Sequence, residues 1–573
     1  MKIDKKNRRW HKSIFLYLTH ERNSVIEKQH IQYNTNQMKK KTSNTNKPVK
    51  IALIAPPYPL SEFPSPPLGI CYVAAACERA GAKVQLFDFI ISEYSQKNLK
   101  KALDDFQPDI VGASSVTMNF PKTADILKTV KKIHPHVITL MGGPHVSFDY
   151  ENVLRLTPEI DIVVIGESEK TLLSLIPNIF NRSRWQTIPG IAFYEKDMVV
   201  ITQEQSLIDN LDDLPLPARH LLNIPKYHTL GFPISIITSR GCPNRCIFCQ
   251  GRRMVGQKVR YRSLNNVVDE IEILLGMGFD LINIADDLFT ANKKRVIQFC
   301  EIIKDRKLSF VWSAFSRVNT VDPEILSMMK SAGCYAVSFG IESGNPEMLK
   351  RIQKGITREQ ARYASKCCKE SGIRTHASFM VGLPGETHET LNDTLEFAES
   401  LGIEYGFHFL SPFPGTTLRE NINDYDLEII TNDWEKYDAN QAIVKTSSLS
   451  PEDIDTFVAN WSKEQNDIWE SQLKAYQKGE TLAPHEQANV EEYHKRRFIF
   501  WLLSENLIEK KGKLNLQTEN PFDNLCERIS QHVSQKVSLM DIEFVKKHLK
   551  PLVEKKYIKC VINQSGNIWQ WCD

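Results

Sequence analysis

The sequence predicts an α/β chain in which two consecutive units with parallel sheets are followed by a helical region. Short apolar runs alternate with helical patterns from about residue 49 to residue 430. These runs are continuous rather than alternating, which is typical of parallel strands covered on both faces. Beyond residue 430 the pattern becomes mostly helical. With 573 residues, 42% hydrophobic and 25% charged, each unit can bury a core of its own.

The start of the chain differs in composition from the rest. Residues 1–50 hold 13 Lys or Arg against three Asp or Glu, whereas the whole chain carries a net charge of only +3. We predict a disordered basic tail over residues 1–48, or an upstream extension with Met38 as an alternative start. A nucleic-acid arm and an organelle-targeting peptide are the alternatives for this tail.

Charge and hydropathy disfavour several classes of function. The net charge is too small to favour a nucleic-acid partner or a membrane surface. No segment reaches about 18 uncharged apolar residues, and we find no signal peptide. We therefore expect a cytoplasmic protein without a membrane span. Most of the twelve cysteines stand alone in apolar patterns, which favours buried free thiols over a disulfide framework.

Residues 49–185 have the pattern of five strand–helix units. The first helical stretch stops at Gly81, where a helix C-terminus often places glycine. Five such units predict a flavodoxin-like (Rossmann-like), doubly wound domain. The expected strands are 51–55, 84–88, 110–113, 137–141 and 162–165, and the expected helices are 69–80, 96–106 and 121–133.

A second strand–helix series occupies residues 231–430. It follows a predicted linker, 186–230, which contains a small hairpin (188–194 with 199–201) and a proline-rich stretch. Six units predict a partial (βα)6 barrel, in which the chemistry lies at the carboxyl ends of the strands. The expected strands are 234–238, 280–285, 309–315, 335–341, 374–380 and 405–410, and the expected helices are 264–277, 292–305, 323–332, 358–371 and 387–401.

The last region, 431–573, is predicted to be a helical C-terminal domain. Its final part, 489–573, has the pattern of a small helical unit that ends in a short strand pair. The region contains no repeat and no catalytic motif. Its position after the barrel is compatible with a cap over the site, a substrate-binding element or a structural extension.

Three cysteines have the spacing of metal ligands. Cys242, Cys246 and Cys249 form a C-x-x-x-C-x-x-C loop directly after the predicted strand 234–238. Three thiolates can hold three irons of a [4Fe–4S] cube and leave the fourth iron open to a substrate. A structural zinc site is the alternative, but it needs four closed ligands, and no fourth Cys or His lies nearby in sequence.

This loop resembles the signature of the radical S-adenosylmethionine (SAM) superfamily, and the similarity covers roughly residues 233–420. The resemblance implies that SAM chelates the open iron and that Phe248 shields the cluster and the adenine. Ile284-Ala-Asp-Asp287 lies where the family usually has Gly-Gly-Glu, so Asp286 or Asp287 should bind the SAM amino group. A helix N-cap is the alternative role for this pair.

Further stretches at predicted strand ends resemble the same family. Glu342, in Ser338-Phe-Gly-Ile-Glu-Ser-Gly344, would contact the SAM amino acid or ribose. Arg317 is a candidate partner for the SAM carboxylate, because arginine pairs with carboxylates bidentately. Gly382, in the stretch 379–387, would belong to the adenine-side loop, and the stretch 412–416 ends the sixth strand.

The first unit joined to such a barrel resembles the cobalamin-binding class of radical SAM enzymes, over about residues 50–420. Flavodoxin-like domains bind ligands at the carboxyl edge of the sheet. The resemblance implies that the loops at this edge hold cobalamin. The candidate residues are Pro67, Gly69, Ser114, Ser115, Thr117, Gly142, Gly143, Gly166 and Glu167.

One departure concerns the cobalt ligand. Many cobalamin domains carry Asp-x-His-x-x-Gly after the first strand, but residues 56–69 contain no histidine here. Either cobalt has no protein histidine below it, as in many members of this class, or the domain has lost cobalamin. We interpret His145 as a loop histidine rather than a cobalt ligand.

The resemblance implies methylation of an unactivated carbon or phosphorus of a small metabolite, peptide or lipid, supported by an electron donor such as flavodoxin or ferredoxin. Two other hypotheses stay open. The first is a cobalamin-assisted oxidation or ring closure, since anaerobic magnesium-protoporphyrin ester cyclases resemble this architecture. The second is a cobalamin or SAM sensor, which the intact cysteine triplet argues against because a sensor needs no open iron.

Overall fold

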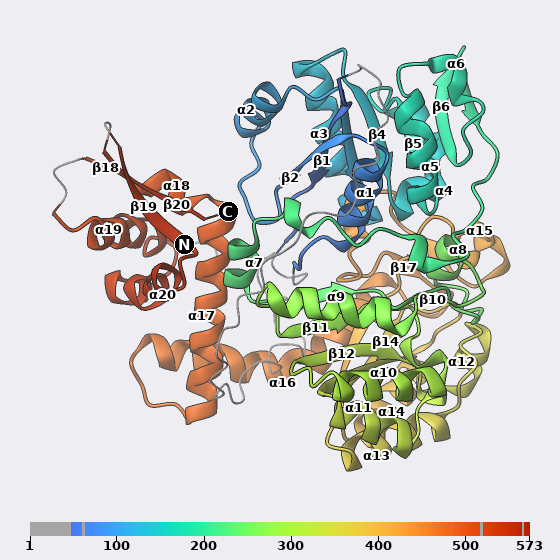
Figure 1. Cartoon of the computed structure of the whole chain (residues 1–573). Helices are drawn as coiled ribbons and strands as arrows, with labels where there is room; N and C mark the ends of the chain where they lie inside the picture. Colours follow the sequence, from blue (N-terminus) through green and yellow to red (C-terminus); the bar gives the residue numbers. More distant parts are fainter. Residues whose placement is uncertain (1–46, 60–63, 516–518, 564–565, 573) are drawn as a thin grey trace.

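A computed structural model describes residues 47–59, 64–515, 519–563 and 566–572 (Figure 1). The predicted basic tail therefore lies outside the described residues, apart from its last two positions. Within the described part of the chain, no helix is long and apolar enough to cross a membrane.

The first unit is a doubly wound sheet, as predicted. Its parallel strands run in the order β2-β1-β3-β4-β5. Successive residues of β1 face opposite cores, with Ile51 and Leu53 packed with α1 and α5, and Ala52 and Ile54 packed with α2, α3 and α4. The elements are β1 (Lys50–Ala55), α1 (Leu68–Arg79), β2 (Lys83–Asp88), α2 (Gln96–Phe106), β3 (Ile110–Ser114), α3 (Phe120–Ile133), β4 (Ile138–Gly142), α4 (Pro144–Leu156), β5 (Ile162–Val164) and α5 (Ser168–Leu175).

The predicted hairpin forms, but it belongs to the first sheet rather than to a separate linker. After the short helix α6 (Arg182–Trp185), strands β6 (Ile191–Glu195) and β7 (Met198–Ile201) add two antiparallel strands beside β5. The three buried residues of β5 would otherwise leave unpaired backbone groups at the sheet edge. The sheet of the first unit consequently extends to residue 201.

The second unit is the predicted six-stranded partial barrel. All six strands are parallel and follow the order β8-β11-β12-β13-β14-β15. The strands are β8 (Ile234–Ile236), β11 (Leu281–Ile284), β12 (Val311–Ser316), β13 (Cys334–Glu342), β14 (Arg374–Val381) and β15 (Glu404–Phe409). The helices are α9 (Leu264–Gly276), α10 (Lys293–Asp305), α11 (Pro323–Ser331), α12 (Pro346–Arg351), α13 (Arg358–Glu370) and α14 (His388–Ser400).

The predicted linker closes the open edge of this barrel at β8. Arg219 donates to the Ser235 carbonyl (2.8 Å), Arg262 donates to the Ile237 carbonyl (2.7 Å), and the fully buried Glu270 pairs with both arginines. These side chains occupy the place that a further strand would take in a complete barrel. The carbonyl groups of the edge strand are thereby satisfied without another strand.

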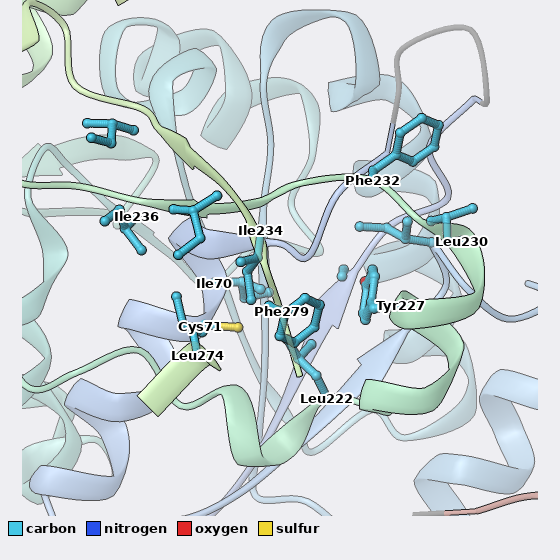
Figure 2. Packing of buried hydrophobic residues seen from close by; sticks show 14 of the residues in the cluster. Ile70, Cys71, Leu222, Tyr227, Leu230, Phe232, Ile234, Ile236, Leu274 and Phe279 are labelled. Atoms are coloured by element: carbon cyan, nitrogen blue, oxygen red, sulfur yellow. The ribbon is translucent and has the colours of Figure 1, made fainter. Parts of the chain in front are cut away.

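The linker also contributes to a core shared by the two units. Figure 2 shows Leu222 and Tyr227, the latter in α7 (Ile224–Leu230), beside Cys71 of α1 and Ile234 and Phe279 of the barrel. The Tyr227 hydroxyl donates to Asp88 at 2.6 Å, and burial raises the pKa of Asp88 to about 6. This segment is thus part of the packed interface rather than an exposed tether.

The C-terminal region covers the other barrel edge and then forms a small unit. Phe457 and Trp461 of α16 pack against Phe407 of β15. The small unit contacts the linker through Asn223, which donates to the Cys572 carbonyl at 3.2 Å, and its sheet has three strands, one more than predicted. The elements are α16 (Pro451–Gln477), α17 (Pro484–Ser504), α18 (Leu507–Lys511), β18 (Lys513–Leu514), α19 (Pro521–Val533), α20 (Ile542–Glu554), β19 (Ile558–Asn563) and β20 (Gly566–Trp571).

Candidate active site

The three cysteines lie on the loop that leaves the first barrel strand. β8 ends two residues earlier than predicted, and the chain continues into β9 (Ser239–Arg240), which pairs antiparallel with β10 (Arg260–Tyr261). The short helix α8 (Gly251–Val255) follows the third cysteine. At Gly241 (φ +107°) a Cβ atom would overlap the Lys258 carbonyl, so this turn requires glycine. The pair β9–β10 closes the base of the cysteine loop.

The sulfur atoms have the surroundings of cluster ligands. The three cysteines share one short loop, and burial, together with the neighbouring Cys246 and Cys242, raises the pKa of the Cys249 thiol. Asn244 donates to the Cys242 sulfur at 3.2 Å, and Arg317 donates to the Cys246 sulfur at 3.9 Å. Within the described residues, no three His, Cys, Asp or Glu side chains are placed to hold a single metal ion. Three thiolates can each hold one iron of a cube, whereas structural zinc needs four ligands, so the three-cysteine spacing favours a [4Fe–4S] cluster over zinc.

The two aspartates after β11 have different positions. Asp286 is buried and accepts hydrogen bonds from the Thr238 backbone and hydroxyl and from the Ser239 hydroxyl, each at 2.6 Å. Burial raises its pKa, and these hydrogen bonds oppose that shift. Asp287 faces the cysteine loop, where it accepts from Gly241 N at 3.2 Å. Asp286 therefore anchors the start of the loop, and Asp287 is the better placed of the two for SAM.

Glu342 lies at the end of β13 in a buried polar group. The group also contains Lys354, which the sequence analysis did not single out. The backbone of Glu342 has φ +75°, which is uncommon for a residue with a side chain. Its carboxylate pairs with Lys354 at 2.8 Å, and a Cβ at Gly340 would overlap it. The Lys354 ammonium lies 5.8 Å from the Phe248 ring centre, beside the cysteine loop. No periodicity or motif marks Lys354, which sequence reasoning missed; only the fold brings it here.

Arg317 is held by the same segment. Its guanidinium donates to the Lys354 carbonyl and, at 3.4 Å, to the Gly355 carbonyl, in addition to the Cys246 sulfur. These contacts occupy donors that a SAM carboxylate would need. A role of Arg317 toward SAM stays a prediction, and Lys354 is a second cation within the same group.

The loop after β14 packs beside both the cysteine loop and the C-terminal region, because Leu383 shares one buried cluster with Ile247 and Val444. Gly382 (φ +82°) donates to the Glu386 carboxylate at 2.6 Å, and a Cβ there would lie 2.9 Å from Val444. Leu383 N also donates to Glu386, at 3.1 Å. Gly382 thus lies against the C-terminal region, and its predicted adenine contact stays a prediction. Burial raises the pKa of Glu386 to about 8, which the two backbone hydrogen bonds oppose.

The raised pKa of Glu386 predicts that the stability of the protein depends on pH. The native state retains the Glu386 proton up to about pH 8, whereas the unfolded chain releases it near the ordinary glutamate pKa of 4.5. The native state therefore binds more protons between these values, and stability falls as the pH rises through this window. We expect Glu386→Gln to reduce the fall in Tm between about pH 5.5 and about pH 8.5. Glu396→Gln, on the exposed face of α14, is the control; an unchanged fall in the Glu386 variant would contradict the prediction.

The loops after β3 and β4 of the first unit form one ledge at the carboxyl edge of its sheet. Ser115 N donates to the Gly142 carbonyl at 3.0 Å, and a Cβ at Gly143 (φ +105°) would overlap the Ser115 carbonyl. Ser114 and both glycines are half-buried, whereas Ser115 and Thr117 are buried. Nδ1 of the buried His145 lies 3.3 Å from the Thr117 hydroxyl, away from the ledge surface.

Open space adjoins this ledge on both sides. A Cβ at Gly69 or at Gly166 would meet no atom within 4 Å, and Pro67 precedes α1 at the same edge. Exposed backbone at glycines lets a ligand approach closely, so these loops fit a large cofactor. Glu167 differs from its neighbours, because both of its carboxylate oxygens are bonded by arginines of the second unit.

The prediction that this ledge binds the corrinoid can be tested by adding one methyl group. Gly143→Ala introduces backbone strain of about 1–3 kcal/mol and an overlap with Ser115. We expect the variant to lose corrinoid affinity by tenfold or more while it keeps its iron content. Gly402→Ala, where φ is also positive but no atom lies within 4 Å, is the matched control. Equal corrinoid titrations for both variants would rule out the ledge as the binding site.

The ledge and the cysteine loop meet. Gln250, next to Cys249, donates to the Pro414 carbonyl at 2.6 Å and to the Pro144 carbonyl of α4 at 3.3 Å. Gly415 lies against Phe148 of α4. The carboxyl edges of both sheets therefore face one another at the cysteines, as expected for two cofactors that act on one substrate.

Comparison with known proteins assigns each of the two units to a family. The family described as Radical SAM superfamily matches residues 236–398, and the family described as B12 binding domain matches residues 61–176. A protein of Pyrococcus horikoshii named as the uncharacterized methyltransferase PH0819 is 36% identical over 416 residues, which cover 71% of this chain and 90% of that protein. This chain belongs to the cobalamin-binding radical SAM enzymes. Its cofactors are a [4Fe–4S] cluster, SAM and cobalamin.

Other cobalamin-binding radical SAM proteins match less closely. The anaerobic magnesium-protoporphyrin IX monomethyl ester cyclase of Rubrivivax gelatinosus is 30% identical over 414 residues, 70% of this chain and 73% of that protein. Among solved structures, OxsB matches with a TM-score of 0.64 at 19% identity, covering 89% of this chain and 80% of that one. TsrM from Kitasatospora setae matches with a TM-score of 0.61 at 18% identity, covering 80% of this chain and all of that one. These structures share the fold with this enzyme.

Proposed function

We propose that this enzyme reductively cleaves SAM and, with cobalamin, methylates an unactivated carbon or phosphorus of a small metabolite, peptide or lipid. The observation that carries the proposal is the contact between the three-cysteine loop and the cobalamin-unit ledge through Gln250. The similarity to PH0819, which is named as an uncharacterized methyltransferase, extends over 90% of the length of that protein and supports the proposal. Relatives are named as methyltransferases of a cytidylyl phosphonate and of bacteriochlorophyllide, and as a hopanoid methylase, so the scaffold accommodates different acceptors.

When bound, the cluster and cobalamin supply one-electron reduction of SAM and a transferable methyl group. The residues of this chain position the reactants. Cys242, Cys246 and Cys249 hold the cluster. The carboxylates of Asp287 and Glu342 attract the amino group of SAM, and the ammonium group of Lys354 attracts its carboxylate. Gln250 donates to Pro144 of the first unit and to Pro414 of the second, and it thereby holds the two cofactor-binding edges together.

The reduction needs a low-potential electron donor such as flavodoxin or ferredoxin. The exposed Arg245 lies between the first two cluster ligands, whereas the charge of the nearby Arg253 is paired with Glu420. Opposite charges steer protein partners together, so Arg245 favours an acidic donor docking over the cluster loop.

A second candidate function is a cobalamin-assisted oxidation or ring closure. It is favoured by the 30% identity to the magnesium-protoporphyrin ester cyclase over 73% of that protein. Incubation with SAM that carries a deuterated methyl group separates the two functions. A product heavier by one labelled methyl group supports methylation, whereas an unlabelled, oxidised product supports ring closure.

The proposed function is tested first by the cofactor content of the protein. Anaerobic reconstitution with iron, sulfide and hydroxocobalamin should give about four iron atoms per chain, as a [4Fe–4S] cube requires, together with one corrinoid. Reduction should then produce 5′-deoxyadenosine from SAM. Iron without corrinoid would overturn cobalamin-mediated methylation, and a cofactor-loaded protein that never cleaves SAM would favour a sensor.

A further inference from the structure

The base of the cysteine loop brings two arginines face to face. In the antiparallel pair β9–β10, Arg240 is directly opposite Arg260. Like charges at directly opposed positions destabilise a strand pair. Both side chains are also buried, with exposed fractions of 8% and 6%. The second unit, taken alone, would thus close its cluster loop with a repulsive pair.

The carboxylate that separates these arginines comes from the first unit. Glu167, at the end of β5, is 7% exposed. Arg260 binds it bidentately, at 2.9 and 2.7 Å, and Arg240 donates to it at 3.2 Å. Glu169 of α5 adds a second carboxylate, 2.7 Å from Arg240. Two carboxylates and two guanidinium groups form a buried, neutral cluster across the interface.

Ion pairing and hydrogen bonding fix the positions of these four side chains relative to one another. Burial raises the pKa of Glu167, but the hydrogen bonds from Arg260 and the charge of Arg240 outweigh it, so the pKa lies below its ordinary value. Arg260 also donates to the Val255 carbonyl at the end of α8, at 2.6 Å. The same guanidinium therefore ties the far end of the cysteine loop to Glu167. Removing one partner of a buried pair leaves an uncompensated charge.

We propose that Glu167 is a positioning residue through which the cobalamin-binding unit closes the base of the cluster loop. The cysteine loop holds its position while the first unit is docked, and it becomes more mobile when the Glu167 carboxylate is removed. This inference rests on the proposed function in its assignment of Cys242, Cys246 and Cys249 as cluster ligands. It goes beyond that function by making assembly of the cluster site depend on the other cofactor's unit.

The test compares Glu167→Gln with the wild type in full-length protein. Gln keeps the shape but leaves two buried, opposed arginines. We expect the reconstituted variant to lose iron to a chelator about tenfold to a hundredfold faster, as for other residues that orient metal ligands. In protein without a cluster, we expect faster trypsin cleavage at Arg245, within the cysteine loop, and at Lys258, between α8 and β10. Iron release and cleavage at wild-type rates would overturn the proposal.

Two further variants separate positioning from general destabilisation. Glu270→Gln removes a fully buried carboxylate that also pairs with two arginines, Arg219 and Arg262, neither of which belongs to the cysteine loop. It should lower Tm without accelerating iron release. Glu167→Gln combined with Arg240→Gln removes one of the opposed charges but keeps the bond from Arg260 to the Val255 carbonyl, and we expect it to regain iron retention relative to Glu167→Gln. A double variant that releases iron as fast as Glu167→Gln would contradict the argument from charge repulsion. Failure of the wild type to bind iron would instead contradict the proposed function.

Discussion

Replacing Cys246 with alanine is expected to abolish SAM cleavage and to reduce iron from about four atoms per chain to less than one. Two thiolates leave two irons of the cube without protein ligands, so the cluster is lost on purification. The Arg317 contact with this sulfur cannot compensate, because a guanidinium is not a metal ligand. Iron and sulfide analysis, the EPR spectrum after reduction and 5′-deoxyadenosine formation are the measurements.

Cys300→Ala is the matched control for this variant. Cys300 is fully buried in α10 of the same barrel, and burial raises the pKa of its thiol to about 12, so it is a packing residue. We expect the control to keep its iron and its SAM cleavage. A Cys246 variant with about four iron atoms per chain and normal SAM cleavage would place the cluster elsewhere.

Replacing Lys354 with methionine is expected to have the second largest effect. Methionine retains the length of the side chain but leaves the Glu342 carboxylate buried without its partner. Breaking a buried pair in this way costs about 3–5 kcal/mol, so Tm should fall by several degrees. If Lys354 also positions SAM, misplacement should lower the rate of SAM cleavage by about a hundredfold.

Lys226→Met distinguishes the two contributions. Lys226 is another buried lysine, 3.2 Å from Glu509, but it lies in α7, away from the cysteine loop. We expect this control to lower Tm and to leave SAM cleavage within twofold of the wild type. If the two variants lose Tm and activity in the same proportion, Lys354 contributes to folding and not to SAM positioning.

The cysteine loop and the order of the strands could be predicted from the sequence because their signals are local. Three cysteines within eight residues carry their own spacing, and continuous apolar runs between glycine-ended helices indicate buried parallel strands. The carboxyl ends of parallel strands share one edge, so candidate residues such as Glu342 and Ser114 could be assigned to the two facing edges. The structure confirms both sheets.

The predicted linker shows where local signals fail. Proline-rich stretches favour an exposed tether, yet Tyr227 is fully buried between the units and Arg219 closes the barrel edge at β8. Burial depends on what the rest of the chain places around a segment, and composition does not contain that information. The same limit applies to Gly382, whose contact with Val444 could not be predicted from the sequence and whose adenine contact stays a prediction.

The sequence by itself determined that this chain has a cobalamin-type unit and a six-stranded radical SAM barrel, and it predicts that Cys242, Cys246 and Cys249 hold the cluster. Only the tertiary structure decided how neighbouring side chains divide their tasks. It turned Asp286 inward and Asp287 toward the loop, and brought Lys354 to Glu342 across 12 positions. It also placed Glu167 between two arginines more than 70 residues away. Spacing along the chain fixes motifs, whereas charge pairing across buried interfaces depends on distances that exist only after folding.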